Sequence, residues 1–380
     1  MFGSVPDFRT PGLTGFYPVP WVGVIKPERV SSAFDSTADR PTKSTMFSKT
    51  LIITTILAVG QILQPASAES HERGVVRSKT DIPAFGLGTW LSERDKVSHA
   101  VQHALDGGYK HIDAALIYKN EDKVGKGLKS SKVKRDDIWV TSKLWNADHR
   151  PDNARKAIEK SISDLGVDYL DLYLIHWPVA FLPGSERLDK ETSLVDTWRA
   201  LEDLVRDNKT RYIGMSNFAP ADIDTILGAC EICPYAHEFE THPYLQQQDF
   251  VDWHLRRGIK VIAYSPLANT NPHYNSDIPV ILDDPFWKMM AETKNATVAQ
   301  TVLAWGLHRG TVVIPKSVHD KYIDENLGAL DVAFAEEDMM KVAEHDKKLR
   351  MNDPGKRWGV DLFEGLDDPT RLVSPGEGEL

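Results

Sequence analysis

Four residues of the sequence could together deliver a proton to a carbonyl oxygen: Asp113, Tyr118, Lys143 and His176. A phenol is a poor acid near neutral pH because its ordinary pKa is about 10, so Tyr118 needs a neighbouring cation. Lys143 can supply that charge and stabilise the phenolate that remains after proton transfer. Asp113 can provide the counter-charge that a buried lysine needs, although this pair alone could be a simple ion pair. His176 can donate a hydrogen bond that orients the substrate oxygen.

The elements that must position these residues form a regular pattern from residue 80 onward. Short apolar, β-branched segments alternate with amphipathic stretches such as 150–166 and 193–208, which we expect to be helices. The segments expected to be strands are 84–90, 111–118, 138–145, 171–177, 212–218, 237–244, 261–267 and 312–317. Eight such units without a GxGxxG fingerprint predict an α/β fold, the (β/α)8 TIM barrel, rather than a doubly wound sheet.

The C-terminal ends of these expected strands carry polar or aromatic side chains. In a TIM barrel all eight ends meet at the catalytic mouth, so we interpret this rim as the active site. Protonating a carbonyl reduces nothing without a hydride donor. Because we expect no metal site and no flavin motif is recognisable, a nicotinamide cofactor is the simplest donor. Lys316 and Ser317 come just before an expected helix, and barrel proteins often bind phosphate at the start of such a helix.

Eight segments give the sequence a family resemblance over residues 76–350. They read GLGTW, HIDAALIYKNEDKVGKGL, VTSKLW, DLYLIHWP, GMSNF, ETHPYLQQ, AYSPL and IPKSVHDKYIDEN. As a set they resemble the aldo-keto reductase superfamily, of the sugar or aldehyde reductase or glycerol dehydrogenase type. The resemblance implies NADP(H)-dependent, reversible reduction of aldehydes and ketones to alcohols. It implies that Tyr118 is the acid, that Lys143 and Asp113 tune it, and that His176 orients the substrate.

The resemblance also implies a cofactor-binding set that runs from the nicotinamide to the adenine. Its members are Thr89, Trp90, Ser216, Asn217, Glu238, Tyr264, Ser265, Leu267, Lys316, Ser317, Tyr322, Glu325 and Asn326. Within it, the carboxamide would contact residues 216, 217 and 238, and the 2′-phosphate would contact residues 316 and 317. The residues implied to surround the substrate are Trp90, Trp145, His176 and Trp177.

Three positions depart from the family pattern. Glu238 stands where the family has a glutamine, and a carboxylate cannot donate to the carboxamide oxygen. Tyr322 replaces a phosphate-pairing arginine and brings no charge to a 2′-phosphate. Ala268 stands where glycine is common. We therefore expect NADPH to remain the preferred cofactor, with NADH tolerated. The first two changes also keep open an alternative, a catalytically weak, cofactor-binding redox sensor or regulatory subunit.

Composition limits the other partners. The formal net charge of −10 and the pI of about 5.7 argue against nucleic acid and anionic membranes as main partners. We expect a small carbonyl substrate, and a monomer or weak dimer. Cys230 and Cys233 are the only cysteines, and we interpret them as two unpaired thiols rather than a redox pair. The loops 178–192 and 268–286 and the segment 350–365 are expected to set selectivity.

The first part of the sequence differs from the rest. Residues 1–75 read as a disordered or leader extension, the barrel domain is expected over 76–365, and 366–380 form a tail. Within the extension, 46–68 combine a charged start, a short apolar stretch and Ala-Ser-Ala, as in a signal peptide. If translation begins at Met46, secretion or the ER lumen becomes the expected location. Because NADPH is scarce outside cells, we favour the cytoplasm, and we expect no stable membrane span.

Overall fold

The computed structural model of the chain describes residues 81–271, 273–274 and 280–366. The expected extension 1–75, with its signal-like segment 46–68, lies outside the described residues, as does the tail from residue 367 onward. The extension, the domain boundary at 75/76 and the cleavage signal therefore stay predictions. Within the described ranges, no helix combines the length and the apolar composition needed to cross a membrane.

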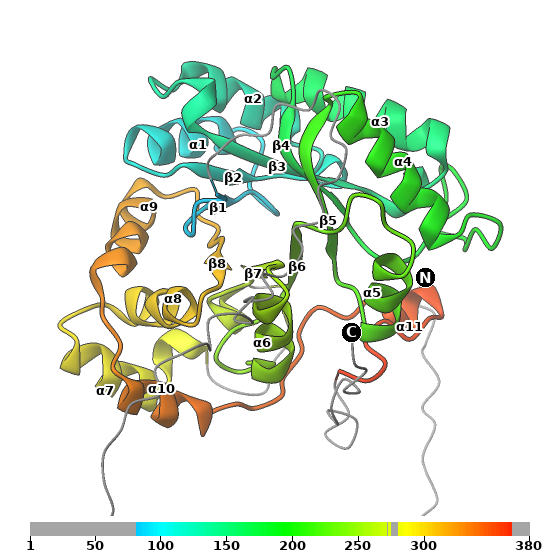
Figure 1. Ribbon diagram of the computed structural model, residues 1–380. Helices are drawn as coiled ribbons and strands as arrows, with labels where there is room; N and C mark the ends of the chain where they lie inside the picture. The colour runs from blue at the N-terminus through cyan, green and yellow to red at the C-terminus, as the bar shows by residue number, and fades with distance from the viewer. Residues whose placement is uncertain (1–80, 272, 275–279, 367–380) are drawn as a thin grey trace, which may run out of the picture. The chain divides into compact units, whose positions relative to one another are not determined.

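Eight parallel strands form a sheet in which each strand pairs with the next one along the chain (Figure 1). They are β1 (Leu87–Gly88), β2 (His111–Asp113), β3 (Trp139–Leu144), β4 (Leu170–Ile175), β5 (Thr210–Ser216), β6 (Ala236–Glu240), β7 (Lys260–Tyr264) and β8 (Val312–Val313). Parallel bridges from Phe85 to Val313 and from Gly88 to Lys316 join the last strand to the first. The expected (β/α)8 barrel is confirmed.

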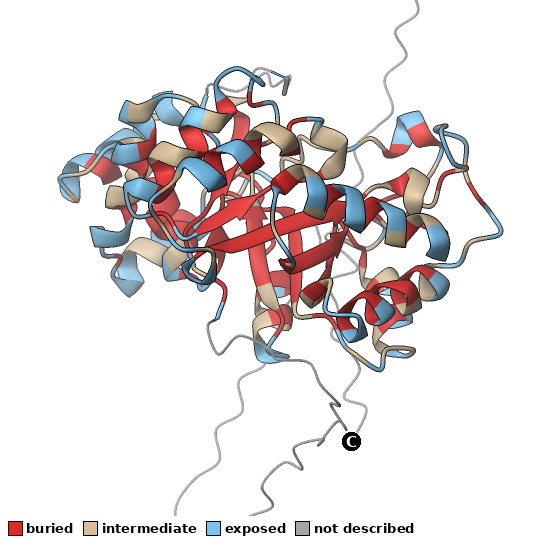
Figure 2. Cartoon of the chain, turned by 90° about the horizontal axis from the view of Figure 1, so that it is seen from above, coloured by how far each residue is buried: buried red, intermediate tan, exposed pale blue. Residues whose placement is uncertain are grey.

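Helices surround this sheet and turn their polar faces outward. They are α1 (Val97–Asp106), α2 (Glu121–Ser130), α3 (Pro151–Leu165), α4 (Leu194–Arg206), α5 (Pro220–Leu227), α6 (Gln248–Arg256), α7 (Pro285–Thr293), α8 (Val298–His308), α9 (Asp320–Leu327), α10 (Glu336–Ala343) and α11 (Gly355–Trp358). Figure 2 shows buried residues in the strands and exposed residues on the outer helix surfaces. Helix α3 falls within the expected helix 150–166; it has Pro151 in its first turn and ends at Gly166, whose φ of 64° is common for a glycine after a helix.

The apolar core has two layers because parallel strands are buried on both faces. In β4, Tyr173 and Ile175 belong to the layer between sheet and helices, whereas Leu172 and Leu174 fill the barrel interior. Trp139 lies in the interior and stacks on Tyr212, with ring centroids 5.5 Å apart. This packed interior leaves the strand ends as the place where polar groups can gather.

Most strands are shorter than the sequence suggested. The expected strand 111–118 ends at Asp113, and Tyr118 instead closes a short 3₁₀ helix, Leu116–Tyr118. The expected strand 312–317 ends at Val313, two residues before Pro315, which has no N–H to donate to a ladder. All the strand ends nevertheless lie at the same end of the barrel. Residues expected on strands, such as Tyr118, therefore lie on the loops that follow the strands and still line the site.

The interpretation of Cys230 and Cys233 as unpaired thiols is wrong. The structure joins them in a disulfide just after α5, with Cα atoms 5.1 Å apart. That separation falls inside the range that a disulfide requires, and the turn between the two residues produces it locally.

Candidate active site

A cleft of about 980 Å³ opens at the C-terminal ends of the strands, and every one of the eight strand ends contributes to it. The sequence-predicted residues that line it are Thr89, Trp90, Asp113, Tyr118, Trp145, His176, Trp177, Ser216, Asn217, Glu238, Tyr264, Ser265, Leu267 and Lys316. The rim inferred from the strand ends is therefore one continuous site.

The remaining predicted residues do not line this cleft. Lys143 lies beneath its floor with no exposed surface. Ser317 and Asn326 are buried near the start of α9 and within it, whereas the Tyr322 side chain lies on the outside of that helix and is 53% exposed. Glu325, also on α9, forms an ion pair with Lys321 at 3.7 Å. The residues that the resemblance implied for adenine binding, Tyr322, Glu325 and Asn326, therefore do not line the cleft.

The ammonium of Lys143 is surrounded by three oxygen atoms. Its Nζ donates to Asp113 Oδ1 at 2.5 Å and to the carbonyl oxygen of Ala114 at 3.1 Å. Glu238 Oε1 lies 3.4 Å from the same nitrogen. These side chains come from β2, β3 and β6, so the cation lies between carboxyl groups on opposite sides of the barrel. Two buried carboxyl groups share one buried cation.

Burial controls the protonation of this cluster. Burial raises the pKa of Asp113 against the attraction of Lys143, and burial together with Asp113 raises the pKa of Glu238 well above its ordinary value. Burial disfavours the Lys143 cation, but Asp113 and Glu238 outweigh it and raise the lysine pKa. Among the described residues, Asp113 Oδ2 and Glu238 Oε2 are buried without a hydrogen-bond partner, so Lys143 is the main group that offsets the cost of burying these two carboxyl groups.

Tyr118 lies directly above this cluster. Lys143 Nζ is 5.4 Å from the centre of its ring. Burial raises the pKa of the phenol, Lys143 opposes that rise, and the charges of Asp113 and Glu238 add to it. The phenol is therefore protonated at neutral pH and can act as a proton donor. The cation beneath it favours the phenolate that proton transfer would leave.

His176 faces the same space from the end of β4. Its ring centre is 5.7 Å from that of Tyr118 and 5.4 Å from that of Trp145. Burial and the charge of Lys143 hold the pKa of this imidazole well below its ordinary value, so it is neutral. Its Nδ1 is buried and has no hydrogen-bond partner among the residues that the structure describes. A neutral imidazole beside a phenol can donate one hydrogen bond to a small oxygen-containing group.

The opposite side of the cleft carries a hydrogen-bonded group of polar side chains. Tyr264 donates from its hydroxyl to Asn217 Oδ1 at 2.7 Å. Asn217 has a φ of 62° and donates from Nδ2 to the carbonyl oxygen of His176 and to Ser216 Oγ, each at 3.0 Å. Ser265 shares a hydrogen bond of 2.7 Å with Tyr274. These bonds hold the Tyr264 ring as a flat wall of the cleft.

Sequence reasoning assigned selectivity to 350–365 but missed the individual residues involved. Trp358 of α11 packs against Trp145, Trp177 and Phe181, with ring centroids 6.1, 5.2 and 5.3 Å apart. Together with Met351 and Asn352 it lines the cleft. The presence of a tryptophan in a polar C-terminal segment could have pointed to Trp358. Nothing in the sequence indicated which aromatic residues it contacts.

A buried carboxylate holds this segment in place. Glu240, at the end of β6, accepts hydrogen bonds from the backbone N–H groups of Met351 and Asn352, each at 2.9 Å. His242 bonds the same carboxylate at 2.9 Å. Because Glu240 has no exposed surface, these contacts fix where the C-terminal segment crosses the cleft.

Comparisons with known proteins agree with this architecture. The Aldo/keto reductase family model matches residues 84–347. The chain is 43% identical over 298 residues to the fission yeast "Uncharacterized oxidoreductase C26F1.07", covering 76% of this chain and 92% of that protein. It is 40% identical over 284 residues to chicken "Aldo-keto reductase family 1 member A1", covering 71% and 87%. An aldose reductase structure from Giardia lamblia superimposes with a TM-score of 0.68 at 36% identity, covering 74% of this chain and 98% of that one.

Proposed function

The chain belongs to the aldo/keto reductase family, and we propose that it is an NADP(H)-dependent oxidoreductase that reversibly reduces aldehydes and ketones to alcohols. The observation that carries this proposal is the buried ammonium of Lys143, paired with Asp113 and lying under the phenol of Tyr118. In reaction terms the proposal is an alcohol dehydrogenase of the NADP⁺ class, acting on CH–OH donors.

Each residue of the cluster has a distinct task in this proposal. Tyr118 gives its phenolic proton to the carbonyl oxygen, and the Lys143 cation stabilises the phenolate that results. Asp113 keeps Lys143 charged and positioned at 2.5 Å. His176 is neutral and donates a hydrogen bond that orients the substrate oxygen. When bound, the nicotinamide supplies the hydride that these residues cannot provide.

The cleft has features that suit a dinucleotide. The Tyr264 ring offers a flat face for stacking, and Ser216, Asn217 and Glu238 place polar atoms next to it. Glu238 Oε2 is buried, has no hydrogen-bond partner within the described ranges, and can accept a hydrogen bond from a carboxamide. At the other end, Lys316 is exposed at the cleft rim after β8, where it can meet a phosphate.

The preference for NADPH over NADH is proposed to rest mainly on Lys316. Tyr322 is uncharged and its exposed ring can cover an adenine, while Glu325 and Asn326 of α9 follow it. Thr89, Ser265, Leu267 and Ser317 complete the proposed cofactor set, as the family resemblance implies. Without a second cation at position 322, NADH should be tolerated more than in a site with two cations.

The substrate is proposed to bind between His176 and the aromatic wall. Trp90, Trp145 and Trp177 line this side of the cleft. It is therefore apolar except near Tyr118 and His176, which would bind the substrate oxygen. Small or aromatic aldehydes fit such a pocket. We propose that the active species is a monomer or weak dimer.

Location in the cytoplasm is part of the proposal, because NADPH is available there. Secretion or entry into the ER lumen, with translation from Met46, is the second candidate, and the Cys230–Cys233 disulfide favours it. N-terminal sequencing of the native protein distinguishes the two. A start near Glu69 would indicate cleavage of the signal-like segment.

The decisive experiment compares the wild type with Tyr118→Phe for NADPH oxidation across a panel of aldehydes and ketones. The substitution should lower kcat by about 10²–10⁴-fold, because it removes a general acid. Tyr173→Phe is the matched control, since the Tyr173 hydroxyl is buried, faces away from the cleft and has no hydrogen-bond partner in the described part of the chain. Full activity in Tyr118→Phe would refute the acid role.

One further outcome would support the alternative function. If the wild type binds NADPH tightly by fluorescence titration but turns over none of the carbonyl compounds, the protein is better described as a redox sensor or regulatory subunit. Two departures keep that alternative open, the carboxylate of Glu238 and the uncharged Tyr322.

A further inference from the structure

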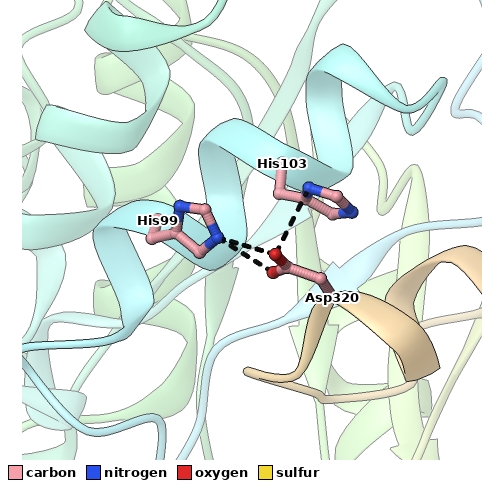
Figure 3. Close-up of side chains that lie close together, drawn as sticks. All are labelled: His99, His103 and Asp320. Carbon is pink, nitrogen blue, oxygen red and sulfur yellow. Dashed lines mark hydrogen bonds and ion pairs between the residues drawn. The ribbon is translucent and has the colours of Figure 1, made fainter.

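Two histidines and an aspartate converge where α1 meets α9 (Figure 3), outside the residues that line the catalytic cleft. His99 and His103 stand four residues apart on α1 and therefore share one helix face. Asp320 is the first residue of α9. His99 Nε2 lies 2.9 Å from both Asp320 oxygens, and His103 Nδ1 lies 3.8 Å from Oδ2. One ring nitrogen of each histidine and one carboxylate oxygen of Asp320 all lie within 4.8 Å of one another.

A fourth residue orients His103 within this group. Its Nε2 lies 2.7 Å from Asp324 Oδ1, one turn further along α9. His103 uses Nε2 for this contact, so Nδ1 is the nitrogen left on the side of Asp320. The distance of 3.8 Å from Nδ1 to Asp320 Oδ2 is too long for a hydrogen bond. A cation placed between these two atoms would be within reach of both.

We propose that His99, His103 and Asp320 form a binding site for a divalent transition metal, of which Zn²⁺ is the expected occupant. Two imidazole nitrogens and a carboxylate oxygen suit Zn²⁺ rather than Mg²⁺ or Ca²⁺, which prefer oxygen ligands only. The contact from Asp324 to the far nitrogen of His103 is the outer carboxylate that commonly accompanies a metal-bound histidine. This proposal departs from the sequence-based expectation of no metal site.

The helices already hold the ligands close to the required positions. Helices α1 and α9 pack side by side, and the buried hydroxyl of Tyr109, just after α1, donates to the carbonyl oxygen of Ile323 at 2.8 Å. Zinc binds imidazole nitrogen at about 2.0–2.1 Å, so the three ligand atoms, which lie within 4.8 Å of one another, would move closer together around one ion. His99 must give up or relocate its Nε2 proton, as metal binding to imidazole requires.

The site is open to solvent on one side. The side chains of His99, His103 and Asp320 are 64%, 29% and 46% exposed. A bound ion would therefore keep at least one water ligand and exchange with the medium. None of these residues lines the catalytic cleft. The ion would link α1 to α9 without taking part in the proposed reduction, and the proposal does not depend on the proposed function.

The test is titration of the full chain with Co²⁺, followed by absorption, and with Zn²⁺, followed by calorimetry. We expect saturable binding, with the visible band of tetrahedral Co²⁺ displaced by Zn²⁺ but not by Mg²⁺. His99→Gln and His103→Gln should each weaken binding by about tenfold or more, as should Asp324→Ala through the outer contact. His308→Gln, which replaces an exposed histidine on α8, is the matched control and should bind like the wild type.

Each outcome decides the proposal. Loss of binding in both α1 variants, with binding retained in His308→Gln, supports it. Absence of saturable binding to the wild type, or binding that is unchanged in the His99→Gln/His103→Gln double variant, overturns it. Because these side chains are partly exposed, the variants should keep the melting temperature that the wild type shows without metal. The melting temperatures of the wild type and of His308→Gln should rise when Zn²⁺ is added, and that of the His99→Gln/His103→Gln double variant should not.

Discussion

Lys143 Nζ lies 3.4 Å from Glu238 Oε1 while it donates to Asp113 Oδ1 at 2.5 Å, so one buried cation contacts two carboxyl groups. The family resemblance implied a carboxamide-binding role for position 238. In the folded chain that position also belongs to the charge cluster beneath Tyr118. The glutamate therefore has a consequence for acid chemistry, because its charge raises the pKa of the phenol above it.

Glu238→Gln should shift the alkaline loss of reductase activity to lower pH. Reduction needs protonated Tyr118, and Glu238 is one of the negative charges that raise the pKa of that phenol, after burial itself. Removing the charge lowers the phenol pKa, so the protonated form is lost at lower pH. The measurement is the pH profile of kcat/KM for carbonyl reduction in wild type and variant. A profile that does not move, or moves to higher pH, would contradict a charge effect of Glu238 on Tyr118.

Lys316→Ala should weaken the use of NADPH much more than that of NADH. A charge-assisted contact to a 2′-phosphate contributes about 1.5–3 kcal/mol, so KM for NADPH should rise by roughly 10–100-fold. Steady-state kinetics with both cofactors checks this. Lys321→Ala is the control, because Lys321 is 75% exposed and already pairs with Glu325. An equal loss with both cofactors, or a wild type that uses NADH as well as NADPH, would argue against the assignment.

Glu121→Gln should stabilise the fold at pH 8 and leave it nearly unchanged at pH 5. Burial raises the pKa of Glu121 to about 7 from 4.5, although Ser142 donates to it at 2.6 Å. A carboxyl group whose pKa is higher in the folded than in the unfolded state stabilises the fold at pH values below its unfolded-state pKa. That contribution is lost as pH rises through about 7, so the wild type weakens between pH 4.5 and 7.

Urea unfolding at the two pH values measures this effect. The variant should be more stable than the wild type by about 1–3 kcal/mol at pH 8. Glu292→Gln on α7 is the control, because that side chain is exposed and should show no pH-dependent difference. Equal differences between wild type and Glu121→Gln at both pH values would show that Glu121 does not titrate in this range.

Trp358→Ala should impair binding of aromatic aldehydes while sparing the cofactor. The indole contacts Trp145, Trp177 and Phe181, and each aromatic pair contributes about 0.5–1.5 kcal/mol beyond its buried area. KM for an aromatic aldehyde should rise about tenfold or more, and KM for NADPH should change little. Trp358→Phe should recover part of the loss. A variant with unchanged aldehyde KM would mean that α11 does not form a wall of the occupied pocket.

The barrel and the residues at its mouth could be predicted from the amino-acid sequence. Alternating strands and helices require parallel pairing, and parallel strands bring all their C-terminal ends to one edge. Residues at the ends of separate strands, such as Asp113, His176 and Ser216, could therefore be placed together before the fold was known. The sequence predicted the ends of strands less accurately than their existence. It predicted Tyr118 on a strand, whereas Tyr118 lies in the short 3₁₀ helix that follows β2.

Which side chains meet across the closed sheet could not be predicted from the sequence and follows from the folded arrangement. Lys143 and Glu238 lie on β3 and β6, which are not neighbours, so no local pattern relates them. The same holds for His99 and Asp320, which are 221 residues apart. Strand pairing is specified by short, repeating patterns along the chain. Contacts across the barrel and between helices arise when the sheet closes and the helices pack on it, and that geometry exists only in the folded molecule.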